Sequence, residues 1–171
     1  MKILGTLAVF ALLAGAAPAT LHAQSDLVFD TTRIQVMTAK RKYAMRVQLA
    51  VSGRQMARGL MFRKTLKPYD GMLFDFGGLT IARMWMKDTK IELDMLFIKA
   101  DGTIESIGHG VPFSFLIIQS KGEVRAVLEI PHGTAKKLGI KPGDRIRHEI
   151  FGSPLKKLPS YKPKPHRKKR S

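Results

Sequence analysis

The sequence predicts a mainly β protein, a single compact β-barrel or β-sandwich domain with two short helices. Three observations lead to this prediction. One segment alternates apolar and polar side chains with the period of a strand, many short apolar runs are separated by turn residues, and only two short stretches have helix start and stop signals. Many short strands with little helix are typical of a barrel or a sandwich.

The first predicted strand and helix follow each other directly. In residues 43–51 the larger apolar side chains occupy every second position, as in a half-buried strand. Ser52 and Gln55 have the spacing of a capping box, in which a hydroxyl and an amide side chain satisfy the first backbone groups of a helix. We therefore expect a short helix that runs to Arg58 and ends at Gly59.

Further strands are predicted by short apolar runs between turn signals, at residues 71–76, 82–87, 93–99, 103–107, 124–130 and 145–150. Asp101 and Gly102 form a good hairpin turn between two of them. Thr134 is predicted to cap a second helix that ends at Gly139. Residues 141–144, with sequence KPGD, suit a type II turn before the last strand.

The N-terminus has the pattern of a secretory signal peptide. Lys2 is followed by an apolar run over residues 3–17, and Ala23 offers a small residue at a cleavage site. We expect residues 1–23 to be removed and the protein to be exported, either periplasmic or secreted. The chain has no cysteine, so neither a disulfide nor thiol catalysis is expected.

Behind the signal peptide we expect a β domain at residues 24–154 and a basic, disordered tail at residues 155–171. The chain has a formal net charge of +17, and the tail combines eight basic residues with three prolines and no acidic residue. Two interpretations of the tail stay open. It is either a solvated segment that aids solubility or a contact to an anionic surface, where a membrane is favoured over nucleic acid.

Six segments resemble one known family in their order and spacing. They are RGLMFR (58–63), GMLFDF (71–76), MWMKDT (84–89), LDMLFI (93–98), VLEI (127–130) and GTAKKLGIKPGD (133–144). Together they resemble the family called domain of unknown function 192, over residues 33–148. The resemblance implies a single mainly β domain that is commonly exported and has no established activity.

The chain also departs from the usual pattern of that family. Asp88 stands where asparagine is usual, Met84 where an aromatic residue is common, Glu92 near a frequent proline, and His132 near a usually small residue. The tail lies outside the family pattern. The resemblance therefore says more about the fold than about the function.

The segment around Trp85 holds the residues that we select for a binding site. If residues 82–87 form a strand, Trp85 and Lys87 share one face, and Met84 and Met86 point to the other face and the core. An aromatic ring beside a cation is a common way to hold an anionic or sugar-like ligand.

We therefore predict that Arg58, Trp85, Lys87 and Asp94 bind a small anionic or polyhydroxylated molecule of the cell envelope. The structural alternative is that Asp94 forms an ion pair with Lys87 or Arg58. Two other functions stay open: an interaction module that the tail tethers to anionic surfaces, and an enzyme that uses Asp94 as a general base. Binding is favoured over catalysis, because no assembled catalytic motif is present.

Metal and cofactor sites are not expected from the sequence. The four histidines after the signal peptide are far apart and lack zinc-site spacing: His109, His132, His148 and His166. Calcium or magnesium at Asp88, Glu92 and Asp94 is disfavoured by the neighbouring lysines. Copper(I) at Met84 and Met86 is less favoured than a core position for both.

Overall fold

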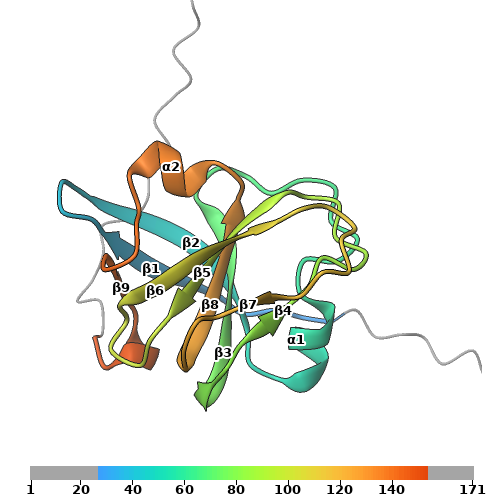
Figure 1. The fold of residues 1–171 in the computed structure, drawn as a ribbon, viewed down its shortest axis with the longest axis horizontal. Coiled ribbons are helices and arrows are strands. Elements are labelled where there is room, and N and C mark those ends of the chain that lie inside the picture. Colours follow the sequence, from blue (N-terminus) through green and yellow to red (C-terminus); the bar gives the residue numbers. More distant parts are fainter. Residues whose placement is uncertain (1–26, 154–171) are drawn as a thin grey trace, which may run out of the picture.

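The computed structural model of the protein describes residues 27–153, and the predicted signal peptide and basic tail lie outside this range. The strands are β1 (Thr31–Met37), β2 (Lys42–Ala50), β3 (Asp70–Thr80), β4 (Arg83–Met84), β5 (Leu93–Ile98), β6 (Ile104–Gly110), β7 (Ile118–Gln119), β8 (Val124–Pro131) and β9 (Arg145–Arg147). The helices are α1 (Gly53–Arg58), α2 (Thr134–Leu138) and a 3₁₀ turn, η1 (Glu149–Phe151) (Figure 1). No helix within residues 27–153 is long and apolar enough to cross a membrane.

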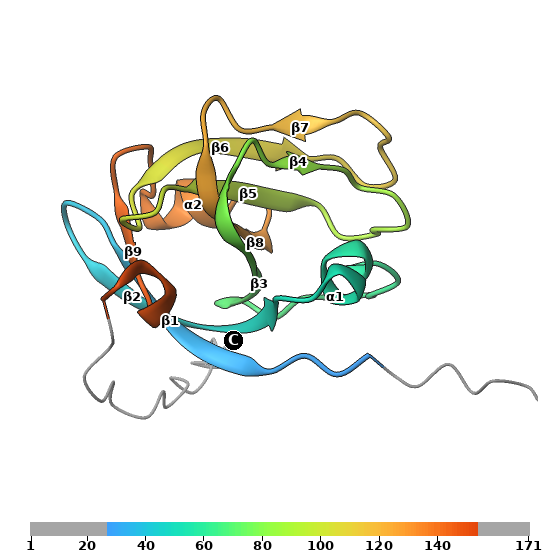
Figure 2. The same cartoon turned by 90° about the horizontal axis from the view of Figure 1, so that it is seen from below.

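Seven of these strands form one curled sheet, in the order β6-β5-β8-β3-β2-β1-β9, and β4 pairs with β7 in a small second sheet. Figure 2 shows the curl, with β5 and β6 on one side of the molecule and β1 and β2 on the other. The predicted mainly β fold with two short helices is confirmed. The sequence did not show that β2 and β3 pair in parallel. Helix α1 and the turns after it connect these two strands.

Strand β2 and helix α1 form as their sequence predicts. The alternating segment becomes β2, where Met45 and Val47 are buried and Ala44 and Arg46 are exposed. The capping box is present: the Ser52 side chain accepts a hydrogen bond from the Gln55 backbone, and the Gln55 side chain accepts one from the Ser52 backbone.

Three predicted details are wrong. The predicted strand over residues 82–87 is reduced to β4, and Trp85 and Lys87 follow it in irregular backbone and a turn. Helix α2 has Gly133 as its N-cap residue, and the Thr134 side chain makes no capping hydrogen bond. The last strand ends at Arg147, after which the chain continues as η1.

Strands β5 and β8 separate two apolar clusters. All six residues of β5 are buried, and so are the five residues at positions 126–130 of β8. One face contributes to a core with Ile34, Leu73, Leu96 and Leu128, and the other to a core with Met72, Phe74, Met86, Met95 and Phe97. Because burial of one such side chain stabilises a fold by about 1.5–3 kcal/mol, these clusters supply the main favourable free energy.

An ionisable side chain lies in the second core. Glu129 of β8 is directly opposite Met72 of β3 and Met95 of β5, and it is only 4% exposed. Burial raises the pKa of its carboxyl group to about 8, because a carboxylate loses its hydration there. At neutral pH Glu129 is therefore protonated and uncharged in the folded protein.

This burial gives the first prediction, for Glu129→Gln. In the unfolded chain the carboxyl group ionises near its ordinary value of 4.5, whereas in the folded protein it holds its proton up to about pH 8. The folded state therefore binds more protons in this interval, and the contribution of Glu129 to the free energy of unfolding decreases as the pH rises from 4.5 to 8. Urea unfolding of both proteins over this interval should show the wild type losing stability relative to the variant. A constant difference would contradict a buried, protonated Glu129.

The two edges of the curled sheet meet at a glycine. Thr103 forms an isolated bridge with Arg145, and the Ile146 N–H donates a 2.8 Å hydrogen bond to the Gly102 carbonyl oxygen. Gly102 has a φ of +86°, and a Cβ atom there would lie 2.3 Å from the Ile146 carbonyl oxygen. A side chain at this position must therefore separate β9 from the start of β6.

The second prediction is that Gly102→Ala lowers the free energy of unfolding by about 1–3 kcal/mol, because it combines a backbone clash with a left-handed conformation. Gly53→Ala is the matched control. Gly53 is the first residue of α1, and a Cβ atom added there would meet nothing within 4 Å outside its chain neighbours and its own helix, so alanine should be neutral or slightly stabilising. Chemical denaturation measures both, and equal effects would show that closure of the sheet does not depend on Gly102.

Candidate functional site

The four residues selected from the sequence do not form one site. Arg58 ends α1 and borders a cleft, Trp85 and Lys87 lie on the surface after β4, and Asp94 is buried in β5. The structure thus divides the predicted site into three parts.

Trp85 and Lys87 contact each other although they do not share a strand. The Lys87 Nζ atom lies 5.6 Å from the centre of the Trp85 ring, and 46% of Trp85 is exposed. Met86 between them is fully buried, and Met84 is partly buried against the same core. The predicted pairing of an aromatic ring with a cation is therefore present, on a turn.

Asp94 has other partners than those predicted. Its Oδ1 atom lies 2.9 Å from Nδ1 of His132, and its Oδ2 atom accepts a 2.8 Å hydrogen bond from the Ala135 backbone N–H. The predicted ion pair with Lys87 or Arg58 is absent from the described residues. Asp94 therefore attaches the segment after β8 to strand β5.

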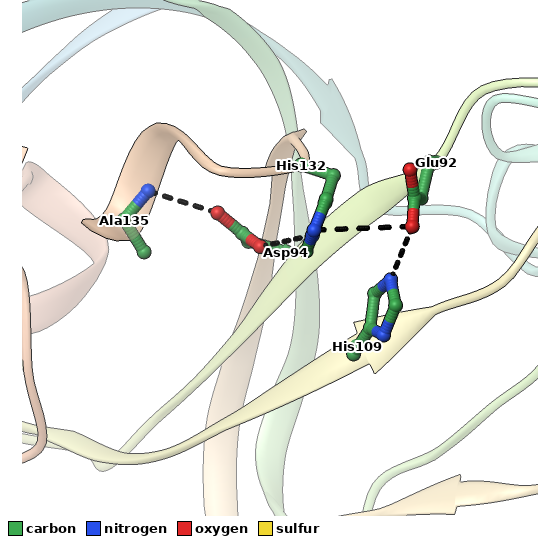
Figure 3. Close-up of polar contacts among 5 residues, drawn as sticks. All are labelled: Glu92, Asp94, His109, His132 and Ala135. Carbon is green, nitrogen blue, oxygen red and sulfur yellow. Dashed lines mark hydrogen bonds and ion pairs between the residues drawn. The ribbon is translucent and has the colours of Figure 1, made fainter. Parts of the chain in front are cut away.

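A polar cluster that the sequence analysis missed lies beside Asp94 (Figure 3). Glu92 Oε1 is 2.6 Å from His109 Nε2 and 3.8 Å from His132 Nε2, and the two imidazole rings stack with their centres 4.2 Å apart. All three residues are exposed, and a donor atom from each lies within 4.8 Å of the others. The spacing of the histidines along the chain gave no signal. Their positions shortly after two predicted strands would have been the better guide.

A second feature is a cleft of about 800 Å³ beside α1, which we call the arginine cleft. It is lined by Leu27, Val28, Phe29, Gln48, Arg54, Ala57, Arg58, Gly59, Met61, Phe62 and Arg63. Arg54 and Arg58 are one helical turn apart, so both point from the same face of α1. Within residues 27–153 none of the three arginines forms an ion pair with a carboxylate.

Aromatic rings hold two of these guanidinium groups. The Arg58 guanidinium lies 4.5 Å from the centre of the Phe62 ring, and that of Arg63 lies 5.8 Å from the centre of the Phe29 ring. Burial, and then repulsion from Arg58, lower the pKa of Arg63, although a guanidinium group stays charged at any physiological pH. The cleft therefore concentrates positive charge that the described part of the protein does not neutralise.

The backbone at the rim of the arginine cleft is strained. Phe62 and Asp88 have φ values of +64° and +53°, and the Phe62 N–H donates a 2.8 Å hydrogen bond to the Asp88 carbonyl oxygen. Such a conformation is unusual for a bulky residue and is found most often at functional sites. The bond also connects the cleft to the turn that holds Lys87.

Comparison with known proteins gives a family and a fold. The model of the DUF192 family, described as "Uncharacterized ACR", matches residues 34–148. A crystal structure from Sinorhizobium meliloti 1021, described as that of a candidate transcription regulator, is 44% identical, with a TM-score of 0.71 over 73% of this chain and 98% of that one. A protein of unknown function from Novosphingobium aromaticivorans DSM 12444 is 33% identical, with a TM-score of 0.68 over 82% of this chain and 100% of that one. No curated protein matches the chain.

The different surroundings of Lys87 and Asp94 give the third prediction. Lys87→Met should change the free energy of unfolding by no more than about 0.5 kcal/mol, because the side chain is exposed and has no ion-pair partner within residues 27–153. Asp94→Leu should cost about 1–3 kcal/mol, because it leaves the buried Ala135 N–H without an acceptor. Urea denaturation of both variants and of the double variant tests this. A costly Lys87→Met that Asp94→Leu relieves would instead show an ion pair between the two residues.

Proposed function

We propose that this chain, which belongs to the DUF192 family, is an exported protein that binds a small anionic ligand in its arginine cleft. One observation supports the proposal most directly. Arg54, Arg58 and Arg63 line one concave surface, and within the described residues none of them has a carboxylate partner. Guanidinium groups bind carboxylate and phosphate through paired hydrogen bonds, and a bound anion of either kind would supply the missing counter-charge.

The size and the walls of the arginine cleft indicate the class of ligand. A volume of about 800 Å³ is in the range of small-molecule sites, and the phenylalanine rings offer apolar area beside the guanidinium groups. A ligand with one or two carboxylate or phosphate groups and a sugar-like or apolar body fits both features. Two of the arginines project from a capped helix, which fixes their spacing before a ligand binds.

Trp85 and Lys87 stay in this proposal because their turn borders the cleft. The hydrogen bond between Phe62 and Asp88 connects the two. Asp94 no longer belongs to it. Each of its carboxylate oxygens already has a hydrogen-bond partner, and the residue is only 6% exposed. Both facts favour a positioning role over that of a general base.

The second candidate function is an interaction module that its basic tail holds at anionic surfaces. The loop between β6 and β7 favours it, because five large apolar side chains there are more than half exposed: Val111, Phe113, Phe115, Leu116 and Ile117. The two functions differ in where the affinity for anions lies. An anion-binding protein keeps it in the arginine cleft, and a tethered module keeps it in residues 155–171.

The fourth prediction separates these functions by calorimetric titration with inorganic phosphate and with citrate. Arg58→Met and Arg63→Met should each weaken binding of the better anion about tenfold or more, because a charge-assisted hydrogen bond contributes about 1.5–3 kcal/mol. Trp85, the only tryptophan, offers a second readout by fluorescence.

Two controls accompany this experiment. Arg41→Met removes the same charge from an exposed position outside the cleft, and deletion of residues 155–171 removes the tail. Neither should alter the affinity. An equal loss of affinity with Arg41→Met would show that binding depends only on net charge. A loss of affinity only with the deletion would favour the tethered module.

A further inference from the structure

We propose that Glu92, His109 and His132 form a binding site for a divalent transition metal ion, with zinc as the ion that fits best. The site shares no residue with the arginine cleft and does not depend on the function proposed above. It departs from our expectation from the sequence, which gave no metal site because the histidines are far apart along the chain.

The sheet brings the three side chains together from neighbouring strands. Glu92 immediately precedes β5, His109 in β6 is directly opposite Asp94 of β5, and His132 immediately follows β8 on the other side of β5. The His132 backbone N–H also donates a 2.9 Å hydrogen bond to the Glu92 carbonyl oxygen. One ligand therefore lies within a strand, and the other two lie next to strand ends that this hydrogen bond joins.

The donor atoms lie near the spacing that an ion requires. Zinc binds imidazole nitrogen and carboxylate oxygen at about 2.0–2.2 Å, so two donors on one tetrahedral ion are roughly 3.4 Å apart. Glu92 Oε1 lies 2.6 Å from one imidazole nitrogen and 3.8 Å from the other, on either side of that value. Small rotations of exposed side chains are enough to admit an ion.

Asp94 supplies an independent argument, because it orients one of the ligands. A carboxylate only accepts hydrogen bonds, so the 2.9 Å contact places the proton of neutral His132 on Nδ1 and leaves a lone pair on Nε2, 3.8 Å from Glu92 Oε1. The Ala135 N–H holds the other oxygen of Asp94 in place. A carboxylate behind a metal-binding histidine is the usual way in which proteins fix its ring and raise its basicity.

The nitrogen and oxygen donors also indicate the kind of ion. Two imidazoles and one carboxylate suit zinc and its neighbours in the first transition row, whereas calcium and magnesium prefer oxygen ligands alone. Three protein ligands leave a coordination position for water or for an anionic group. Two carboxylates, Glu92 and Asp94, would offset the charge of the ion.

The experiment uses the full chain without an affinity tag, titrated with Zn²⁺ by calorimetry and with Co²⁺ by visible absorption. We expect one ion per chain, and Co²⁺ bands with the high intensity that four- or five-coordinate cobalt gives. His109→Ala and His132→Ala should abolish these bands, and Glu92→Gln should weaken them. Asp94→Asn should lower the affinity about 10–100-fold while the shape of the bands is kept, as expected for a positioning residue.

His166→Ala is the matched control, because it removes a histidine of the tail and should leave the titration unchanged. Should Asp94→Asn fail to fold, the surface variant His109→Ala still decides. The proposal is overturned if the wild type gives only the weak bands of hydrated cobalt, or if His109→Ala binds as the wild type does. It is also overturned if His166→Ala removes the binding.

Discussion

The burial of β5 and β8 on both faces constrains the rest of this structure. A strand between two apolar clusters has no side that water can reach, so each polar group on it must be paired or uncharged. Asp94 of β5 satisfies this condition with hydrogen bonds from the segment after β8. Glu129 of β8 satisfies it by remaining protonated. Both solutions follow from the position of the two strands between the apolar clusters.

The same constraint places the chemistry of the molecule at strand ends. Glu92 lies just before β5 and His132 just after β8, where the strands leave the two cores and their side chains reach solvent. The arginines lie on and after α1, which begins the connection between β2 and β3. Strands β5 and β8 thus act as a rigid support for exposed polar side chains that cannot lie within them.

Local features of the sequence predicted local structure well. The alternation in β2 and the capping box of Ser52 and Gln55 depend on residues close together in the sequence, and both are observed. The grouping of side chains from distant segments was not predicted. His109 and His132 are far apart along the chain and meet because β6 and β8 both pair with β5, a register that only the folded sheet defines. Trp85 was misplaced because a short apolar run does not distinguish a strand from a packed turn.

The strand order also has a consequence for the time course of folding. Strand β3 pairs with β2 in parallel and with β8, which comes much later in the chain, and β9 near the end of the domain completes the edge at β1. The sheet therefore cannot be completed until nearly the whole domain is available, and pairing between strands so distant along the chain is associated with slow folding. A chain that folds slowly stays extended for longer, which is an advantage for any polypeptide that must pass through a narrow pore before it becomes compact.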